Sequence, residues 1–347
     1  MSEKKAPKTV KNRIENSAEQ HNKEKEDNKE KTIVKESTDE KKKEEEEELQ
    51  KKIESTKKAG EIAKKIKNAI RPKIKVGVKA INIIKEIENM IFDLEAKPAF
   101  PINICINNIA AHYTSPIKDE MVINEGDIVK IDFGVHIDGF CVDNAFSLSF
   151  NDNEALKNIV EAPEVAVKAA IMMMKPGVKT NEIGNKIEQI IKGYGFTSIK
   201  ELGGHSVERW RVHGSKELPN HSSKHGTEIE ENEIYAVEVF ASTGEGTVHR
   251  SRNVYIYSLN SSAGRVPLRR KISRKILGLI SKEYKTLPFC ERQLLAELKS
   301  GTSFGLQELI NSGKITQYPV LLERKGVYIS QHEETVLITK DGCTQLT

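Results

Sequence analysis

The stretch from Val129 to Phe146 reads VKIDFGVHIDGFCVDNAF, two strand-like segments joined by a turn. If the turn is at Ile137-Asp138, Asp132 lies directly opposite Asp143; if it is at Asp138-Gly139, the two are diagonal neighbours. Either register puts both carboxylates on one face. Two like charges on an apolar hairpin destabilise it unless a cation lies between them or one carboxyl is protonated. The pair therefore predicts a metal site.

The first 56 of the 347 residues differ in composition from the rest, being nearly all Lys, Glu, Asp, Asn and Ser. Such a segment has little apolar surface to bury, so we expect residues 1–56 to be a disordered arm or a transient helix held by Lys/Glu pairs four apart. The arm is either a solubilising segment or a docking segment for ribosomal RNA or an acidic protein, which implies contact with the ribosome or a translation factor.

The remaining chain lacks the sequence signals of nucleic-acid-binding, disulfide-rich and membrane proteins. The net charge is +4, and the sequence after the arm shows no single basic stripe interleaved with aromatic residues, so nucleic acid is not the expected substrate. Cys105, Cys141, Cys290 and Cys343 have no CxxC spacing, which favours buried thiols in the reducing cytoplasm. We find no signal peptide and no apolar run long enough to cross a membrane, so we expect no membrane partner.

An internal repeat organises the rest of the chain. Residues 76–91 align without gaps on residues 176–191, and each copy has a Gly-Val-Lys turn before a helical pattern. Isoleucines recur four apart at 83, 87 and 91 and again at 183, 187 and 191, one apolar stripe per helix. Strand patterns follow each copy. We therefore predict two related α+β halves about a pseudo-twofold axis, with joined sheets and a site between them.

Three further residues are candidate metal ligands. Glu238 lies in the apolar strand pattern 234–240, and Glu333 precedes the apolar run 335–338. A buried carboxylate without a partner becomes protonated, whereas a divalent cation keeps it ionised. His205 follows two glycines that permit close backbone approach. Together with Asp132 and Asp143, these residues form an oxygen-rich set that suits paired Mn, Fe, Co or Zn ions.

From about Lys57 to its end, the chain resembles the type II methionine aminopeptidases. The matching motifs are Phe100-Pro101, Asn107 to Thr114, Lys130 to Gly134, Gly204-His205-Ser206, Arg211-Val212-His213, Tyr235 to Glu238, Ser242-Thr243-Gly244 and Gln331-His332-Glu333. The resemblance implies the α+β, duplicated pita-bread (creatinase/aminopeptidase) fold over residues 57–347. It also implies two divalent metal ions (Mn, Co, Fe or Zn) and removal of the N-terminal methionine from nascent polypeptides whose second residue is small.

The resemblance also implies roles for individual residues. Asp132 would chelate one ion, His205 and Glu238 would hold the other, and Asp143 and Glu333 would bridge both. Glu238 would also shuttle a proton, and His112 and His213 would steady the tetrahedral intermediate and the leaving nitrogen. Phe100, Val212 and Tyr318 would line the pocket for the methionine side chain, where His112 and His213 would also contact the substrate. Glu334 should face the opposite side of the strand from Glu333.

A helical insert distinguishes the type II subclass. Residues 262–322 are expected to form it, with two or three helices between Leu268 and about Ile310. Type I members have a shorter connection between the positions of Glu238 and Glu333. Two rival hypotheses stay open. One is a catalytically inactive relative of the same fold that binds RNA or the ribosome; the other is an X-Pro dipeptidase. The complete ligand set argues against the first, and the expected disordered arm in place of a folded N-terminal domain argues against the second. We therefore expect a methionyl aminopeptidase, and we expect it to be a monomer.

Overall fold

The computed structural model describes residues 41–298 and 300–347. The chain divides after Lys52 into two units, Met1–Lys52 and Ile53–Thr347. In the first unit residues 41–52 are helical, and Lys43 Nζ lies 3.9 Å from Glu47 Oε1. Most of the expected arm lies outside the described residues. Residues 53–56, which we had assigned to the arm, are helical in the second unit, and Thr56 is buried there. The division into arm and catalytic domain stays a prediction.

The second unit combines helices with antiparallel sheets. Residues 53–70 are helical, and the α-helices that follow are α2 (Ala80–Asp93), α3 (Glu161–Met173), α4 (Thr180–Gly193), α5 (Lys271–Leu279), α6 (Glu291–Leu298) and α7 (Thr302–Asn311). The strands are β1 (Lys97–Pro98), β2 (Asn103–Ile106), β3 (Ile109–Ala111), β4 (Ile128–Ile137), β5 (Phe140–Ser149), β6 (Thr197–Ser198), β7 (Gly203–Ser206), β8 (Glu217–Pro219), β9 (Ile234–Ser242), β10 (His249–Leu259), β11 (Phe289–Cys290), β12 (Ile315–Leu322), β13 (Ile329–Thr339) and β14 (Gly342–Gln345). Within the described ranges, no helix combines the length and apolar character needed to span a bilayer.

The repeat in the sequence is a repeat in the structure. Helices α2 and α4 each have 14 residues and follow turns in which Gly77 and Gly177 adopt φ values of 86° and 87°. A side chain is strained at such φ values, which explains glycine at both positions. Each glycine N–H donates to a carbonyl of a distant segment, that of Ile123 or of Ile229. Both isoleucine stripes are buried. The predicted duplication is therefore confirmed.

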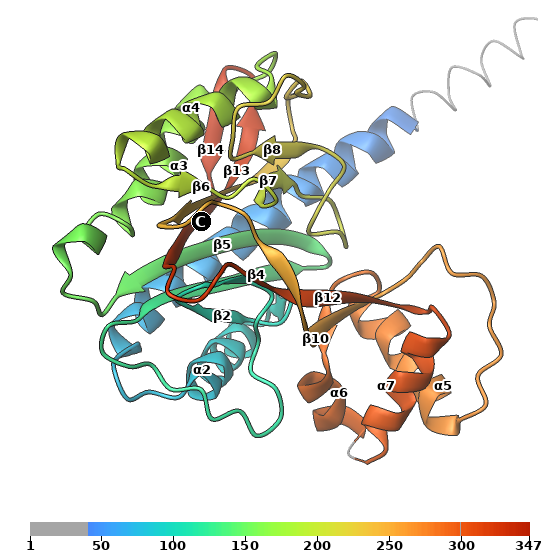
Figure 1. Ribbon diagram of the computed structural model, residues 1–347. Helices are drawn as coiled ribbons and strands as arrows, with labels where there is room; N and C mark the ends of the chain where they lie inside the picture. The colour runs from blue at the N-terminus through green and yellow to red at the C-terminus, as the bar shows by residue number, and fades with distance from the viewer. Residues whose placement is uncertain (1–40, 299) are drawn as a thin grey trace, which may run out of the picture. The chain divides into compact units, whose positions relative to one another are not determined.

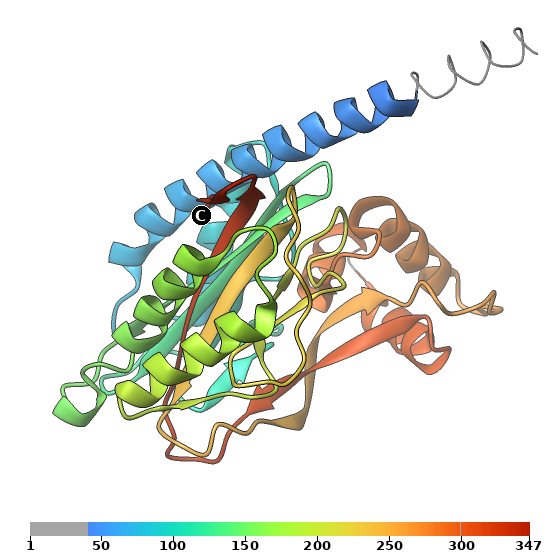
Figure 2. The same ribbon diagram turned by 90° about the horizontal axis from the view of Figure 1, so that it is seen from above.

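One large sheet joins the two halves, with strand order β1-β4-β5-β13-β9-β7-β8. The helix 53–70 and α2 share a core with Ile131 and Phe133 of β4, and α3 and α4 share a second core with Val237 and Val239 of β9. Figures 1 and 2 show α3 and α4 side by side. Because successive strand residues point to opposite faces, Asp132 and Glu238 lie on the face away from these helices.

The predicted insert contains both helices and strands. Helices α5, α6 and α7 lie within the predicted insert and form a core of their own, as expected for two or three helices. In Figure 1 they are grouped at one end of β10 and β12. Residues 315–322 are not helical; they form β12, which pairs with β10 and β3 in a smaller sheet of order β11-β10-β12-β3. The insert is thus anchored to the rest of the fold by backbone hydrogen bonds.

Candidate metal centre

The hairpin that carries both aspartates turns at Asp138-Gly139. Both turn residues have positive φ, 50° and 83°, the signature of a type I′ turn. This turn pairs Gly134 with Asp143 and Asp132 with Ala145, so the two aspartates are diagonal neighbours. The second of the two registers left open by the sequence is the one observed. A type I′ turn matches the right-handed twist of the strands, which favours this register.

Three neighbouring strands bring the other candidate ligands beside the aspartates. Glu333 of β13 is the register partner of both Ala145 of β5 and Glu238 of β9. His205 of β7 lies opposite Ala236 of β9. Two groups of potential ligand atoms result, each within 4.8 Å: one from Asp143, His205 and Glu333, the other from Asp132, Glu238 and Glu333. Glu333 is common to both groups. The resemblance had placed Glu238 with His205, whereas here Glu238 lies in the group with Asp132.

Burial makes this cluster of carboxylates unfavourable without a cation. Desolvation raises the pKa of Asp132 to about 7. It also raises the pKa values of Asp143, Glu238 and Glu333 well above their usual range, and repulsion among the carboxylates adds to each shift. Asp132 Oδ1, Asp143 Oδ1 and Glu333 Oε1 are sealed from solvent and accept no hydrogen bond. Unpartnered anionic oxygens from three strands fit divalent cations of the hard or borderline class.

His205 has the protonation state and orientation of a ligand. Burial, and then the neighbouring His213, lower the pKa of His205 well below 6.5, so the imidazole is neutral. Its Nδ1 lies 3.2 Å from the carbonyl oxygen of Ser206, which can only accept, so Nδ1 carries the proton. The lone pair on Nε2 is then available, and this atom lies 3.9 Å from Asp143 Oδ2. Such a bond through the other ring nitrogen is typical of metal-binding histidines.

The cluster opens into a cavity of about 900 Å³. Its lining includes Asp132, Asp143, His205 and Glu238 together with the other predicted site residues: His112, His213, Phe100, Val212 and Tyr318. His112 follows β3 with a φ of 65°, and its Nδ1 donates to the carbonyl of Pro319 at 3.1 Å. The rings of His205 and His213 lie 4.1 Å apart, edge to face. Burial lowers the pKa of His112, and lowers that of His213 to about 4. Both are therefore neutral at pH 7.

Two residues of β13 contact the candidate ligands, although no role was predicted for them. Gln331 Nε2 donates to Glu238 Oε1 at 2.7 Å and lies 3.4 Å from Asp132 Oδ2. Thr335 Oγ1 accepts from the N–H of Asp143 at 2.8 Å and donates to its carbonyl at 2.6 Å. Both lie on the face of β13 that carries Glu333, two residues to either side. Alternate residues of a strand share a face, so the positions two residues before and after Glu333 could have been predicted to lie beside it.

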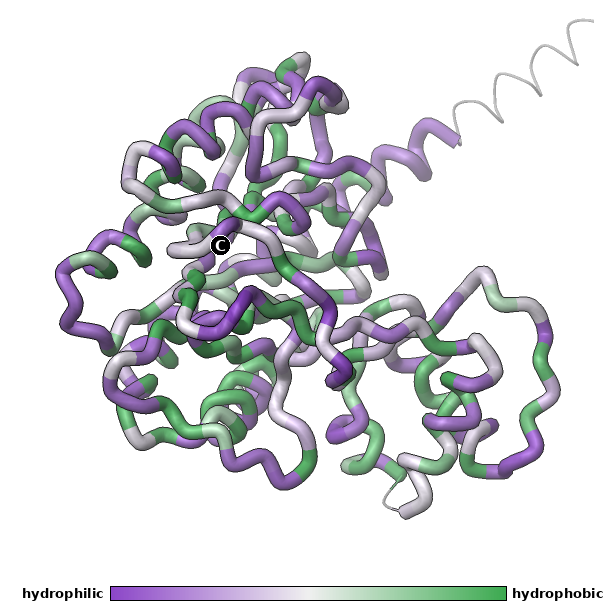
Figure 3. Tube along the Cα trace, in the orientation of Figure 1, coloured by the Kyte–Doolittle hydropathy of each residue, from purple (hydrophilic) through white to green (hydrophobic). Residues whose placement is uncertain are grey.

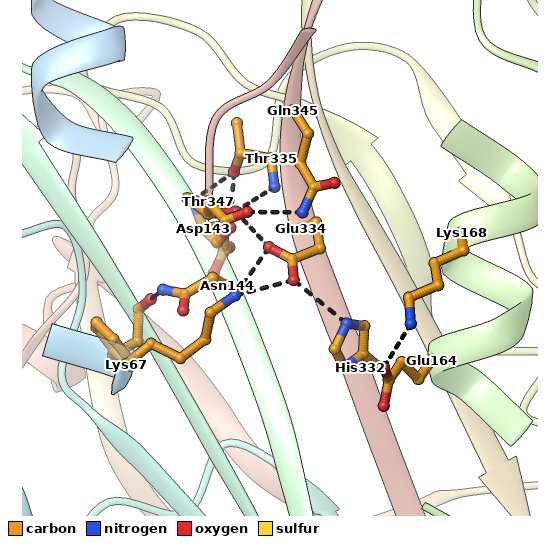
Figure 4. Close-up of polar contacts among 11 residues, drawn as sticks. Lys67, Asp143, Asn144, Glu164, Lys168, His332, Glu334, Thr335, Gln345 and Thr347 are labelled. Carbon is orange, nitrogen blue, oxygen red and sulfur yellow. Dashed lines mark hydrogen bonds and ion pairs between the residues drawn. The ribbon is translucent and has the colours of Figure 1, made fainter. Parts of the chain in front are cut away.

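The opposite face of β13 carries a separate polar network. Glu334 points away from Glu333, as predicted, and both of its oxygens accept from Lys67 Nζ at 2.9 Å (Figure 4). Thr347 Oγ1 donates to Glu334 at 2.9 Å, and His332 Nε2 lies 3.3 Å away. Lys67 belongs to the helix 53–70. The network therefore joins this helix to the strand on which Glu333 and Gln331 lie.

Comparisons with known proteins point to metallopeptidases, which agrees with a cluster of side chains suited to divalent cations. The model of metallopeptidase family M24 matches residues 54–258. The chain is 36% identical over 299 residues to a methionine aminopeptidase of Methanothermobacter thermautotrophicus, covering 86% of this chain and 99% of the relative. It is 39% identical over 286 residues to a methionine aminopeptidase of Archaeoglobus fulgidus, covering 82% and 95%.

Similar solved structures show the same fold at lower identity. A thermophilic Arx1 has a TM-score of 0.73 at 21% identity, with 85% of this chain and 90% of that chain covered. The methionine aminopeptidase of Thermotoga maritima has a TM-score of 0.63 at 21% identity, covering 86% and 96%. The prolidase of Pyrococcus furiosus has a TM-score of 0.53 at 20% identity, and only 64% of that chain is covered.

Proposed function

Because this chain belongs to metallopeptidase family M24, as a hydrolase that removes N-terminal methionine, we propose that the carboxylates and His205 described above form its dinuclear metal centre. The pita-bread fold expected from the sequence is the fold observed. The observation that carries the proposal is the pair of ligand groups that share Glu333 and contain three unpartnered oxygens. We also assign the chain to the type II subclass, because it carries the helical insert expected of that subclass.

The ligand roles follow the resemblance. Asp132 would hold one ion, His205 and Glu238 the other, and Asp143 and Glu333 would serve both. The two groups of ligand atoms support a shared Glu333, and the closeness of Glu238 to Asp132 leaves Glu238 within reach of either ion. Ions bound there supply a Lewis acid and lower the pKa of water. Their identity among Mn, Co, Fe and Zn, and their number, are parts of the proposal.

The cavity residues would bind and orient the substrate. His112 donates through Nδ1 to Pro319, so its Nε2 presents a lone pair that can accept a hydrogen bond from a substrate N–H. Glu238 lies on the cavity wall, where it would carry a proton from the attacking water to the leaving amine. His213, beside His205, would steady the charge that develops on the carbonyl oxygen. Phe100, Val212 and Tyr318 supply apolar and aromatic surface for a methionine side chain.

The partners follow from this activity. The substrates are N-termini of nascent polypeptides, with a small second residue expected. Contact between the charged arm and the ribosome or a translation factor stays a prediction, as do a cytoplasmic location and a monomeric state.

Release of methionine from Met-Ala and Met-Val peptides tests the proposal. Protein loaded separately with Mn, Co, Fe or Zn should release free methionine with at least one of these ions. The Asp132→Asn variant should bind less metal and lose activity while keeping its circular dichroism spectrum. Asp152→Asn, at an exposed site, is the matched control and should behave like wild type. No release with any of the four ions, or faster cleavage of X-Pro peptides, would refute the proposal.

A further inference from the structure

A strongly basic surface surrounds the start of α5. Six cationic side chains lie within eleven residues and all are exposed: Arg265, Arg269, Arg270, Lys271, Arg274 and Lys275. We call these residues the basic face. The insert, residues 262–322, has eleven Lys and Arg against four Glu, whereas the whole chain has a net charge of only +4. In Figure 3 the chain turns hydrophilic where α5 begins. Positive charge is therefore concentrated in the insert.

The fold places one carboxylate, that of Glu308, close to these charges. Within the described residues, none of the six forms an ion pair with a carboxylate. The carboxylate of Glu308 on α7 is already engaged: it accepts the backbone N–H groups of Arg269 at 2.9 Å and Arg270 at 3.1 Å, and the hydroxyl of Ser273. Glu308 thus fixes the backbone at the start of α5. The guanidinium of Arg274 donates to the carbonyls of Leu268 at 2.6 Å and Arg269 at 3.1 Å, and all six cationic residues remain exposed.

The helix itself strengthens the positive potential. Its first turn contains no acidic residue, and the side chain of its N-cap residue, Arg270, makes no capping hydrogen bond. Lys271, Arg274 and Lys275 share one face of α5 by their spacing of three and four. Cations at the positive end of a helix dipole are unfavourable, and the one carboxylate at this end, that of Glu308, offsets only part of the charge of six cations. The basic face is therefore suited to a highly charged anionic partner.

We propose that the basic face binds the phosphate backbone of RNA. Four of the six cations are arginines, whose guanidinium groups match phosphate geometry. Arg270 also lies 5.9 Å over the ring of Phe304, which is 70% exposed and offers an aromatic surface beside the charges. We had found no basic stripe interleaved with aromatic residues in the sequence; the contact between α5 and α7 creates this combination. A membrane surface fits less well, because Phe304 is the only large exposed apolar side chain described within residues 262–322.

The position of the basic face relates this binding to the substrate. Ser261 lines the active-site cavity, and only three residues separate it from Arg265, a span of at most about 14 Å. Nascent chains emerge from a particle whose surface is largely RNA. RNA bound at the basic face would therefore hold the cavity near emerging N-termini. The binding itself does not require the metal centre, so it can be tested independently of the proposed hydrolysis.

Fluorescence anisotropy with a labelled 20-base-pair RNA duplex tests the proposal on the full chain. The test variant is Arg265→Gln/Lys271→Gln/Lys275→Gln. The control variant Lys175→Gln/Lys186→Gln/Lys325→Gln removes the same net charge from exposed lysines elsewhere. At ~100 mM salt the test variant should bind roughly tenfold more weakly, and the slope of log K against log salt should fall by about 2 to 3. The control should bind as wild type, and both variants should cleave a short Met-Ala peptide at the wild-type rate.

Three results would overturn the proposal. Wild-type protein that does not bind the duplex at this salt concentration has no RNA-binding face. Equal weakening in the test and control variants would show that only net charge matters. Tighter binding to vesicles containing phosphatidylserine than to the duplex, lost in the test variant alone, would assign the face to a membrane surface instead.

Discussion

Gln331 Nε2 lies 2.7 Å from Glu238 Oε1, although 93 residues separate the two in the sequence. The same amide lies 3.4 Å from Asp132 Oδ2. Gln331 therefore contacts one candidate ligand from each half of the duplicated fold while standing two residues from Glu333 on the same strand. A neutral donor at this position orients two anionic side chains without adding charge to an already crowded cluster.

Replacement of Gln331 by Ala should weaken metal binding. Loss of a hydrogen bond that orients a metal ligand typically lowers affinity by about 10- to 100-fold. Titration of metal-free protein with Co²⁺, followed by calorimetry and by visible absorption, measures both affinity and coordination. The control is Gln307→Ala at an exposed site on α7. Unchanged affinity and an unchanged absorption spectrum would show that Gln331 does not position the ligands.

Metal-free protein should lose stability as pH rises through neutrality. Asp132 has a folded-state pKa of about 7 against a usual value of 3.8. Between these values the folded state holds a proton that the unfolded state has released, so this contribution to stability is complete below about pH 4 and is lost as pH rises through 7. Thermal unfolding in EDTA from pH 5 to 8 should show a falling Tm for wild type. The decline should be shallower for Asp132→Asn, and an identical decline in both proteins would contradict the prediction.

Gly139→Ala should destabilise the aspartate hairpin. A Cβ at this position would lie 2.3 Å from the ring of Trp210, and the φ of +83° is itself strained for alanine. Gly77→Ala is the matched control, since Gly77 has a φ of +86° but a Cβ added there would meet no atom within 4 Å. The control isolates the backbone cost of about 1 kcal/mol. Urea unfolding should show a loss for Gly139→Ala that exceeds the control by about 2 kcal/mol. Trp210 is the chain's only tryptophan, so its fluorescence reports the same site.

Lys67→Met should destabilise the fold through Glu334. The ion pair is largely shielded from solvent, with side chains 13% and 8% exposed, and removal of the lysine leaves a carboxylate without its main partner. Breaking such a pair costs about 3 kcal/mol, and the double variant Lys67→Met/Glu334→Gln should recover part of this loss. Denaturant unfolding measures both values. Lys64→Met, an exposed site on the same helix, should be nearly neutral. No recovery in the double variant would argue against the pair as the cause.

Local sequence patterns were enough to predict the main elements and the candidate ligands. The isoleucines of α2 and α4 fixed two equivalent helices because a period of 3.6 residues is a local property of the chain. Asp132, Asp143, Glu238 and Glu333 were recognisable because charges are rare in apolar strand patterns. Strand alternation was likewise sufficient to predict that Glu334 faces away from Glu333.

How these residues meet depends on contacts between segments that are distant in the sequence. The type I′ turn at Asp138-Gly139 selected one of two registers that the strand pattern allowed equally. The contact of Gln331 with Asp132 spans 199 residues, and the pair Lys67 and Glu334 spans 267. Contacts of this kind depend on which strands become neighbours in the sheet, and local periodicity carries no information about that choice. The basic face follows the same rule, because the packing of α7 against α5 is what brings Glu308 to the backbone of Arg269 and Arg270 and the ring of Phe304 beside Arg270.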